Sequence, residues 1–247
     1  MIIDRGSREP EVRQELHEIC SIVKHRAGYD YTDYCFLEVL PPFIGEGVNK
    51  CIANGIGLIT VMPYFLYPGM KLKDTVKQSA KICKDLEVKV AIARPLSYHP
   101  MMAQLIMDRL RQLKNDRGID FADRECDIVL IGHGSSDRNA REAFMFTADS
   151  LKKYYRNVHS CFLELDRPSI QEGIEKAVFS NPKVLLIMPY FLHKGAHVKV
   201  DVIKEVEAGL YKYGFKSAFI AKHLGVDEKL VDLVVERAKE VEKRFGI

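Results

Sequence analysis

Short apolar runs alternate along the chain with longer stretches in which apolar residues recur every three or four positions. The runs predict buried strands at residues 1–3, 34–37, 58–62, 88–93, 126–131, 160–163, 184–188 and 217–221. The periodic stretches predict helices around residues 12–23, 44–54, 73–86, 101–113, 140–155, 170–179, 198–211 and 228–245. Because the strands are apolar throughout and alternate with helices, they predict parallel sheets covered on both faces.

The pattern occurs twice, because a large part of the first half is written again in the second. Met-Pro-Tyr-Phe-Leu stands at residues 62–66 and again 126 residues later, at 188–192. The same offset relates Phe-Leu-Glu at 36–38 to 162–164 and Glu-Gly at 46–47 to 172–173, and an offset of 128 relates Gly-Ser at 6–7 to 134–135. This period is far longer than the 20–50 residues of solenoid repeats.

The repeat therefore predicts a duplicated domain. We expect two doubly wound α/β domains, residues 1–115 and 116–247, each with a mostly parallel four-stranded sheet flanked by helices. The boundary lies in the polar, turn-prone stretch at 114–118.

Composition narrows the class of protein without naming its chemistry. Hydrophobic residues make up 47% of the 247 residues and charged residues 29%, which is typical of a globular protein. The net charge of +3 gives no whole-chain signal for nucleic acid. No apolar run reaches the roughly 18–20 residues that span a bilayer, so we expect a cytoplasmic protein with no membrane partner. The six cysteines form no Cys-x-x-Cys pair and are expected to be reduced and buried.

Candidate chemistry gathers where strands of the second half end, the edge at which open parallel sheets bind ligands. His133 follows the strand at 126–131, His193 and His197 follow the strand at 184–188, and Glu164 closes the strand at 160–163, so all belong to the same edge. Neutral imidazole binds divalent cobalt, nickel, iron and zinc. Two histidines without a cysteine or a fixed third ligand predict an open site that hands a metal on. The alternative for each histidine is an ordinary hydrogen-bonded surface residue.

The neighbouring residues allow two interpretations. Ser135 and Ser136 either cap the following helix or belong to a helix N-terminus that binds an anion. Phe191 is expected to pack beneath the sheet edge, whereas Tyr190 fits either the core or the site. The Gly-His-Gly at 132–134 lacks the Gly-Lys-Ser/Thr ending of a phosphate-binding loop, which disfavours a nucleotide-binding protein.

The motifs as a set resemble the sirohydrochlorin cobaltochelatase and ferrochelatase family, the class II chelatases, in its two-domain form. They are Gly-His-Gly-Ser at 132–135, Phe-Leu-Glu at 162–164 and Pro-Tyr-Phe-Leu-x-x-Gly-x-His at 189–197. The resemblance implies insertion of a divalent metal, most often cobalt, into sirohydrochlorin in a cleft between the domains. It maps the two family histidines onto His133 and His197 as metal ligands and the acidic residue onto Glu164, all three catalytic. The metal is then a substrate, Co²⁺ or Fe²⁺, and no cofactor is permanently bound.

Sirohydrochlorin carries many carboxylates, so the site should offer cations and free N–H groups. The residues expected to bind it in the second half are Ser135, Arg167, Leu192, His193, Lys194, Gly195 and Ala196. In the first half Arg5 stands in place of His133 and Lys71 in place of His197, so that half should not hold a metal. These two cations either hold substrate carboxylates or reflect structural drift.

The sequence thus predicts one active site per chain, carried by the second half. Insertion of Co²⁺ into sirohydrochlorin for cobalamin synthesis is the leading interpretation, and ferrochelatase activity for sirohaem synthesis is the alternative. A non-catalytic carrier of tetrapyrrole or metal is the competing class. The two domains are sufficient as a monomer, and a dimer is compatible with the sequence.

Overall fold

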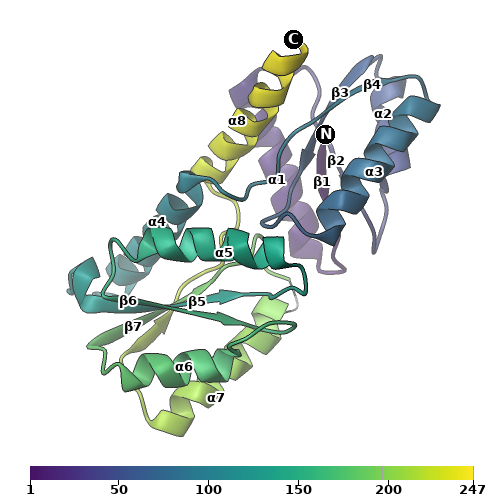
Figure 1. The fold of residues 1–247 in the computed structure, drawn as a ribbon. Helices are drawn as coiled ribbons and strands as arrows, with labels where there is room; N and C mark the ends of the chain where they lie inside the picture. Colours follow the sequence, from purple (N-terminus) through teal and green to yellow (C-terminus); the bar gives the residue numbers. More distant parts are fainter. Residues whose placement is uncertain (196, 247) are drawn as a thin grey trace. The chain divides into compact units, whose positions relative to one another are not determined.

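The computed structural model describes residues 1–195 and 197–246, except for the side chains of residues 197–199 (Figure 1). Its strands form two four-stranded sheets, in which every pairing is parallel. The first sheet has the order β2-β1-β3-β4, with β1 (Ile2–Asp4), β2 (Tyr34–Phe36), β3 (Leu58–Pro63) and β4 (Lys89–Ile92). The second has the order β6-β5-β7-β8, with β5 (Cys126–Gly132), β6 (Asn157–Phe162), β7 (Val184–Pro189) and β8 (Ala218–Ile220). The duplicated, doubly wound α/β fold predicted from the sequence is confirmed.

Helices follow the strands in the predicted order. They are α1 (Pro10–Ala27), α2 (Ile44–Ala53), α3 (Met70–Asp85), α4 (Pro100–Arg117), α5 (Arg138–Leu151), α6 (Ile170–Phe179), α7 (Ile203–Tyr213) and α8 (Glu228–Phe245), with a short 3-10 turn η1 (Asp123–Glu125). One predicted helix is different: before α7 the backbone forms a π-helical turn, η2 (His197–Val202). No helix in the described part of the chain is long and apolar enough to cross a membrane.

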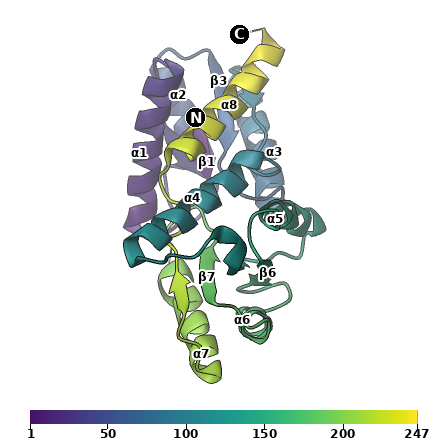
Figure 2. The same cartoon turned by 90° about the vertical axis from the view of Figure 1, so that its left-hand side faces the viewer.

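Packing groups the elements into two compact units, and each unit contains the last helix of the opposite half of the sequence. Unit 1 comprises Met1–Ser97 and Val226–Ile247, and unit 2 comprises Tyr98–Gly225. In unit 1, α8 packs against β3 and beside α1 (Figure 2). In unit 2, α4 packs against α5 and β7. The boundaries read from the repeat, 1–115 and 116–247, describe the order along the chain, whereas each unit takes the final helix of the other half.

Each unit has its own apolar core between sheet and helices. In unit 1 the core includes Ile3 and Val61, and in unit 2 Ile131 and Ile187, all fully buried. The six cysteines are free and buried, as expected. Burial raises the pKa of Cys35 to about 12, so this core thiol stays protonated at neutral pH.

The repeated Glu-Gly pair has a structural explanation at the start of α6. The Glu172 side chain accepts a hydrogen bond of 2.6 Å from the Ser169 backbone N–H, while the Ser169 hydroxyl accepts one from the Glu172 N–H, which makes a capping box. A Cβ atom on Gly173 would lie 2.5 Å from the Cβ of Cys161 on β6. The same close approach recurs at Gly47 in unit 1, so the glycine lets the helix pack onto the sheet.

Candidate functional site

The carboxyl edge of the second sheet, where its strands end, brings His133 and Glu164 together. His133 follows the last residue of β5, and Glu164 lies two residues beyond the end of β6. The Leu163 N–H donates to the Gly132 carbonyl at 2.9 Å, and the Glu164 N–H donates to the His133 carbonyl at 3.0 Å. Strand pairing thus continues past both strand ends and sets the two side chains on neighbouring backbones.

The glycine after His133 makes this approach possible. Gly134 has a φ of +91°, a left-handed conformation that favours glycine, and a Cβ atom there would lie 1.8 Å from the Glu164 carbonyl oxygen. Gly6 has a φ of +101° and the same relation to Glu38 in unit 1, at 2.3 Å. The repeated Gly-Ser of the sequence therefore marks a place where two loops touch.

The His133 ring and the Glu164 carboxylate form a pair that a cation can join. Nε2 of His133 lies 3.1 Å from Oε1 of Glu164, and Nδ1 lies 3.3 Å from the Gly134 carbonyl oxygen. If Nδ1 carries the hydrogen and donates it to Gly134, the Nε2 lone pair faces the carboxylate. Two ligands held about 2.0–2.2 Å from one metal ion at roughly right angles are about 3 Å apart. The observed separation therefore suits a shared proton or a shared metal ion.

Both members of the pair are accessible to a ligand. The exposed fraction of the side chain is 29% for His133 and 47% for Glu164. The second predicted metal ligand, His197, has a side chain that lies outside the described residues, and Ala196 lies outside them entirely. In the part of the chain that the structure describes, no three His, Cys, Asp or Glu side chains gather as a metal cage.

In unit 1 the corresponding edge of the sheet holds a carboxylate between two cations. Arg5 Nε donates to Glu38 Oε1 at 2.8 Å, and Lys71 Nζ donates to Glu38 Oε2 at 2.6 Å. The hydrogen bond from Lys71 and that from Arg5 hold the pKa of Glu38 below its usual value, against the opposing effect of burial. Each carboxylate oxygen already has a cation beside it, so this edge repels a metal ion.

The residues expected to bind substrate near the start of α5 and α6 are placed by local contacts. The Ser135 hydroxyl accepts a hydrogen bond from the Asp137 N–H at 3.0 Å, and Asp137 itself caps α5. The interpretation of Ser135 as the helix cap is therefore wrong, because an aspartate two residues later takes that role. Arg167 is exposed, and its Nη1 donates to Glu172 at 3.1 Å.

The loop after β7 presents the remaining candidates. Lys194 is exposed, His193 and Gly195 are partly buried, and Leu192 is buried, with its carbonyl accepting a hydrogen bond from the Gly225 N–H at 2.9 Å.

The aromatic pair that follows β7, Tyr190 and Phe191, packs in or against the core. Tyr190 is 1% exposed, its ring lies 5.9 Å from that of Phe144, and its hydroxyl lies 3.5 Å from the Thr147 hydroxyl. This resolves the open interpretation in favour of packing. Phe191 packs against the core cluster beneath the sheet edge, as predicted. The sequence pattern did not single out Leu165, because leucine is not a residue type that indicates a left-handed backbone, and its φ of 61° is seen only in the structure.

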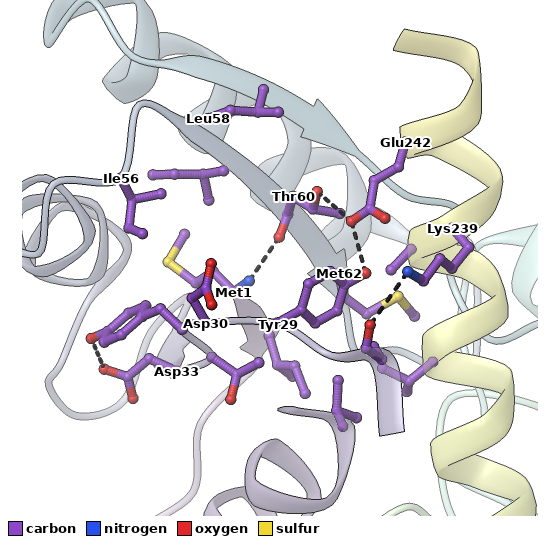
Figure 3. A pocket seen from close by; sticks show the side chains of 18 of the residues that line it. Met1, Tyr29, Asp30, Asp33, Ile56, Leu58, Thr60, Met62, Lys239 and Glu242 are labelled. Atoms are coloured by element: carbon purple, nitrogen blue, oxygen red, sulfur yellow. Dashed lines mark hydrogen bonds between the residues drawn. The ribbon is translucent and has the colours of Figure 1, made fainter. Parts of the chain in front are cut away.

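A cavity of about 580 Å³ in unit 1 lies at the opposite edge of its sheet, where β1 and β3 begin (Figure 3). Glu242 of α8 points into it and accepts hydrogen bonds from the Tyr29 hydroxyl at 2.7 Å and the Thr60 hydroxyl at 2.9 Å. These contacts tie α8 to the sheet. The cavity lies at the strand starts, whereas Glu38 follows the end of β2, so cavity and carboxylate do not share a site.

The two units share one fold and carry a carboxylate at the matching strand end, Glu38 in unit 1 and Glu164 in unit 2. The CbiX family model matches residues 1–113 and again residues 127–241. The chain belongs to the CbiX family.

The similar proteins include chelatases named for two different metals, cobalt and iron. The chain is 26% identical to a sirohydrochlorin cobaltochelatase from Priestia megaterium, over 97% of this chain and 78% of that one. It is 24% identical to a sirohydrochlorin ferrochelatase from the same organism, over 97% and 88%. The solved structure of SirB from Bacillus subtilis with Fe3+ has the same fold, with a TM-score of 0.82 at 21% identity over 99% of this chain and 96% of that one.

Proposed function

We propose that this chain inserts a divalent metal ion into sirohydrochlorin at the carboxyl edge of the second sheet. Family membership and the activities named for two relatives along nearly the whole chain support the proposal. The observation that carries it is the 3.1 Å approach of His133 Nε2 to Glu164 Oε1, with both side chains accessible.

His133 and His197 are the proposed metal ligands, and Glu164 is the proposed acidic partner. The repeat supports the role of His197, since its counterpart Lys71 bonds to the counterpart carboxylate, Glu38. By analogy with this pair in unit 1, we propose that His197 acts together with Glu164 in unit 2.

The reaction exchanges one metal ion for two pyrrole N–H protons, so the products are the metallated ring and two protons. An imidazole lone pair that has released the metal is free to accept one of these protons, and the Glu164 carboxylate can accept the other. The same side chains therefore present the metal before the transfer and take up protons after it. An open, weakly held ligand set suits this sequence because a closed cage would retain the ion.

Substrate carboxylates meet the cations and N–H groups around the pair. In unit 2 these are Ser135, Arg167, His193, Lys194 and the backbone of residues 192–196. In unit 1 we propose that Arg5 and Lys71 bind carboxylates, because both keep accessible N–H groups after bonding to Glu38 and the trio carries a net positive charge.

Cobalt is the proposed metal and ferrous iron the alternative. Imidazole and carboxylate ligands suit both ions, and geometry and metal supply decide between them. The test is to mix purified protein with sirohydrochlorin and Co²⁺, Fe²⁺ or Ni²⁺ in turn and to follow the absorbance change of the ring. We expect the largest ratio of catalysed to uncatalysed rate with Co²⁺. A larger ratio with Fe²⁺ would identify a ferrochelatase, and rates equal to the protein-free control with every metal would refute catalysis.

A further inference from the structure

The loop that follows β6 holds a leucine in a conformation that leucine disfavours. Leu165, directly after Glu164, has a φ of 61° and a side chain that is 69% exposed. Its counterpart after β2, Val39, has a φ of 77° and is 45% exposed. A left-handed backbone is unfavourable for a residue with a Cβ and is rarer still for a β-branched one.

Neither residue recovers that cost by burial, because both side chains remain in solvent. Glycine or asparagine would adopt the same φ with less strain. The two halves have diverged at Arg5 and His133, yet both keep a large aliphatic side chain at this exposed position. Residues whose backbone strain is not offset by packing are found most often at ligand sites.

The loop is fixed well enough to present this side chain in one place. The Phe162 N–H donates to the Pro168 carbonyl at 2.9 Å, which closes the loop on itself. Asp166 forms an ion pair with Arg141 of α5 and accepts a hydrogen bond of 2.7 Å from the Arg167 N–H. Leu165 therefore lies on an anchored loop, one residue from the proposed metal-handling carboxylate.

We propose that Leu165 is a binding residue for the flat, apolar face of the tetrapyrrole. This inference rests on the proposed function. A macrocycle offers carboxylates at its periphery and an apolar face at its centre, so a site that receives it needs an aliphatic contact beside the metal and cations farther out. Leu165 supplies that contact and holds the ring centre beside Glu164 and His133.

The test replaces Leu165 with asparagine and, separately, with glycine, both of which tolerate the left-handed backbone. Loss of one aliphatic contact should weaken sirohydrochlorin binding roughly tenfold. We expect KM for sirohydrochlorin to rise by that factor in both variants, kcat to stay within about twofold, and the melting temperature to stay equal or rise as strain is relieved. Phe179→Asn is the matched control: this residue is 71% exposed at the end of α6, beside the first residue of β6, and should leave KM unchanged.

Two results would overturn the inference: an unchanged KM in both Leu165 variants, or a melting temperature several degrees lower in both, which would assign the leucine to the fold. A metal-free titration of sirohydrochlorin by its own absorbance separates this inference from the proposed function. Binding that depends on Leu165 in a protein without turnover would support the leucine contact and refute the chelatase. Turnover with Leu165-independent binding would do the reverse.

Discussion

At the scale of single residues, the two halves differ in what stands on either side of one carboxylate. Glu38 lies between the cations Arg5 and Lys71, which satisfy both of its oxygens. Glu164 instead faces the imidazole ring of His133, whose Nε2 lies 3.1 Å from Glu164 Oε1. Replacing imidazole by a permanent cation removes a possible ligand and adds repulsion, so two substitutions are enough to turn the proposed metal-handling edge into an ion-paired one.

Glu164→Gln keeps the shape of the side chain and removes its negative charge. If Glu164 accepts a proton and shares the metal with His133, kcat should fall about 10²-fold or more. Steady-state rates of metal insertion measure this. Glu38→Gln is the control at the repeat position and should leave kcat within about twofold. Equal losses of kcat in the two variants would contradict a single site in the second half.

Lys71→Ala tests the role of the unit 1 cations in holding substrate. One accessible charge contributes up to about 1 kcal/mol, so KM for sirohydrochlorin should rise roughly fivefold, with kcat unchanged and the effect shrinking as salt increases. KM measured at two salt concentrations decides this. A KM equal to that of the unsubstituted protein at both would assign Arg5 and Lys71 to structural drift.

At the scale of elements, the site depends on how closely the loops after β5 and β6 touch. Gly134→Ala would place a Cβ 1.8 Å from the Glu164 carbonyl oxygen, so the two loops must separate. Turnover should be lost, with the melting temperature lowered. Gly214→Ala has a similar left-handed φ of +61° but open space around it, and should cost only about 1 kcal/mol of stability with turnover intact. Wild-type turnover in the Gly134 variant would refute the close-contact explanation.

A second network ties the starts of β5 and β6 to the end of α6. Burial alone would raise the pKa of Asp127, but hydrogen bonds from Arg156, Ser180, Asn157 and His159 outweigh it and lower the pKa from 3.8 to about 2. A carboxyl group whose pKa is lowered by folding contributes stability above its unfolded value, and the contribution is lost as pH falls through the folded value. The contribution is about 2 kcal/mol.

The free energy of unfolding should therefore be about 2 kcal/mol lower at pH 2 than at pH 4 because of Asp127. Other carboxylates add their own effects to this difference. Asp127→Asn should lower stability at pH 7 and make the pH 4 to pH 2 difference smaller. Circular dichroism is the suitable probe, because the chain contains no tryptophan. An unaltered pH dependence in the variant would show that Asp127 is not the group concerned.

The sequence predicted most elements because apolar runs and helical periodicity report burial directly. It also predicted the edge that carries His133 and Glu164, since parallel strands end on the same side. It did not predict the π-helical turn η2, whose residues have ordinary helical spacing. It missed Leu165 because backbone φ is set by loop closure rather than by the residue itself.

At the scale of the whole molecule, the duplication is visible in the order of the elements along the chain. The two compact units do not coincide with the two halves of the sequence. The final helix of each half of the sequence, α4 or α8, packs on sheet elements that come from the other half and belong to its own compact unit. No local sequence signal distinguishes this exchange, because each helix presents an apolar face that either sheet could cover. Neither half of the sequence is therefore expected to fold alone with its own last helix.

The account centres on a metal-insertion site carried by the second half alone. The most direct test is the initial rate of Co²⁺ insertion into sirohydrochlorin by the unsubstituted protein and by His133→Ala, with the exposed α1 residue His25→Ala as the control. We expect the unsubstituted protein and the His25 variant to react at equal rates, well above the protein-free mixture, and the His133 variant to lose at least about 10²-fold in kcat. A His133 variant that keeps the full rate would contradict the account.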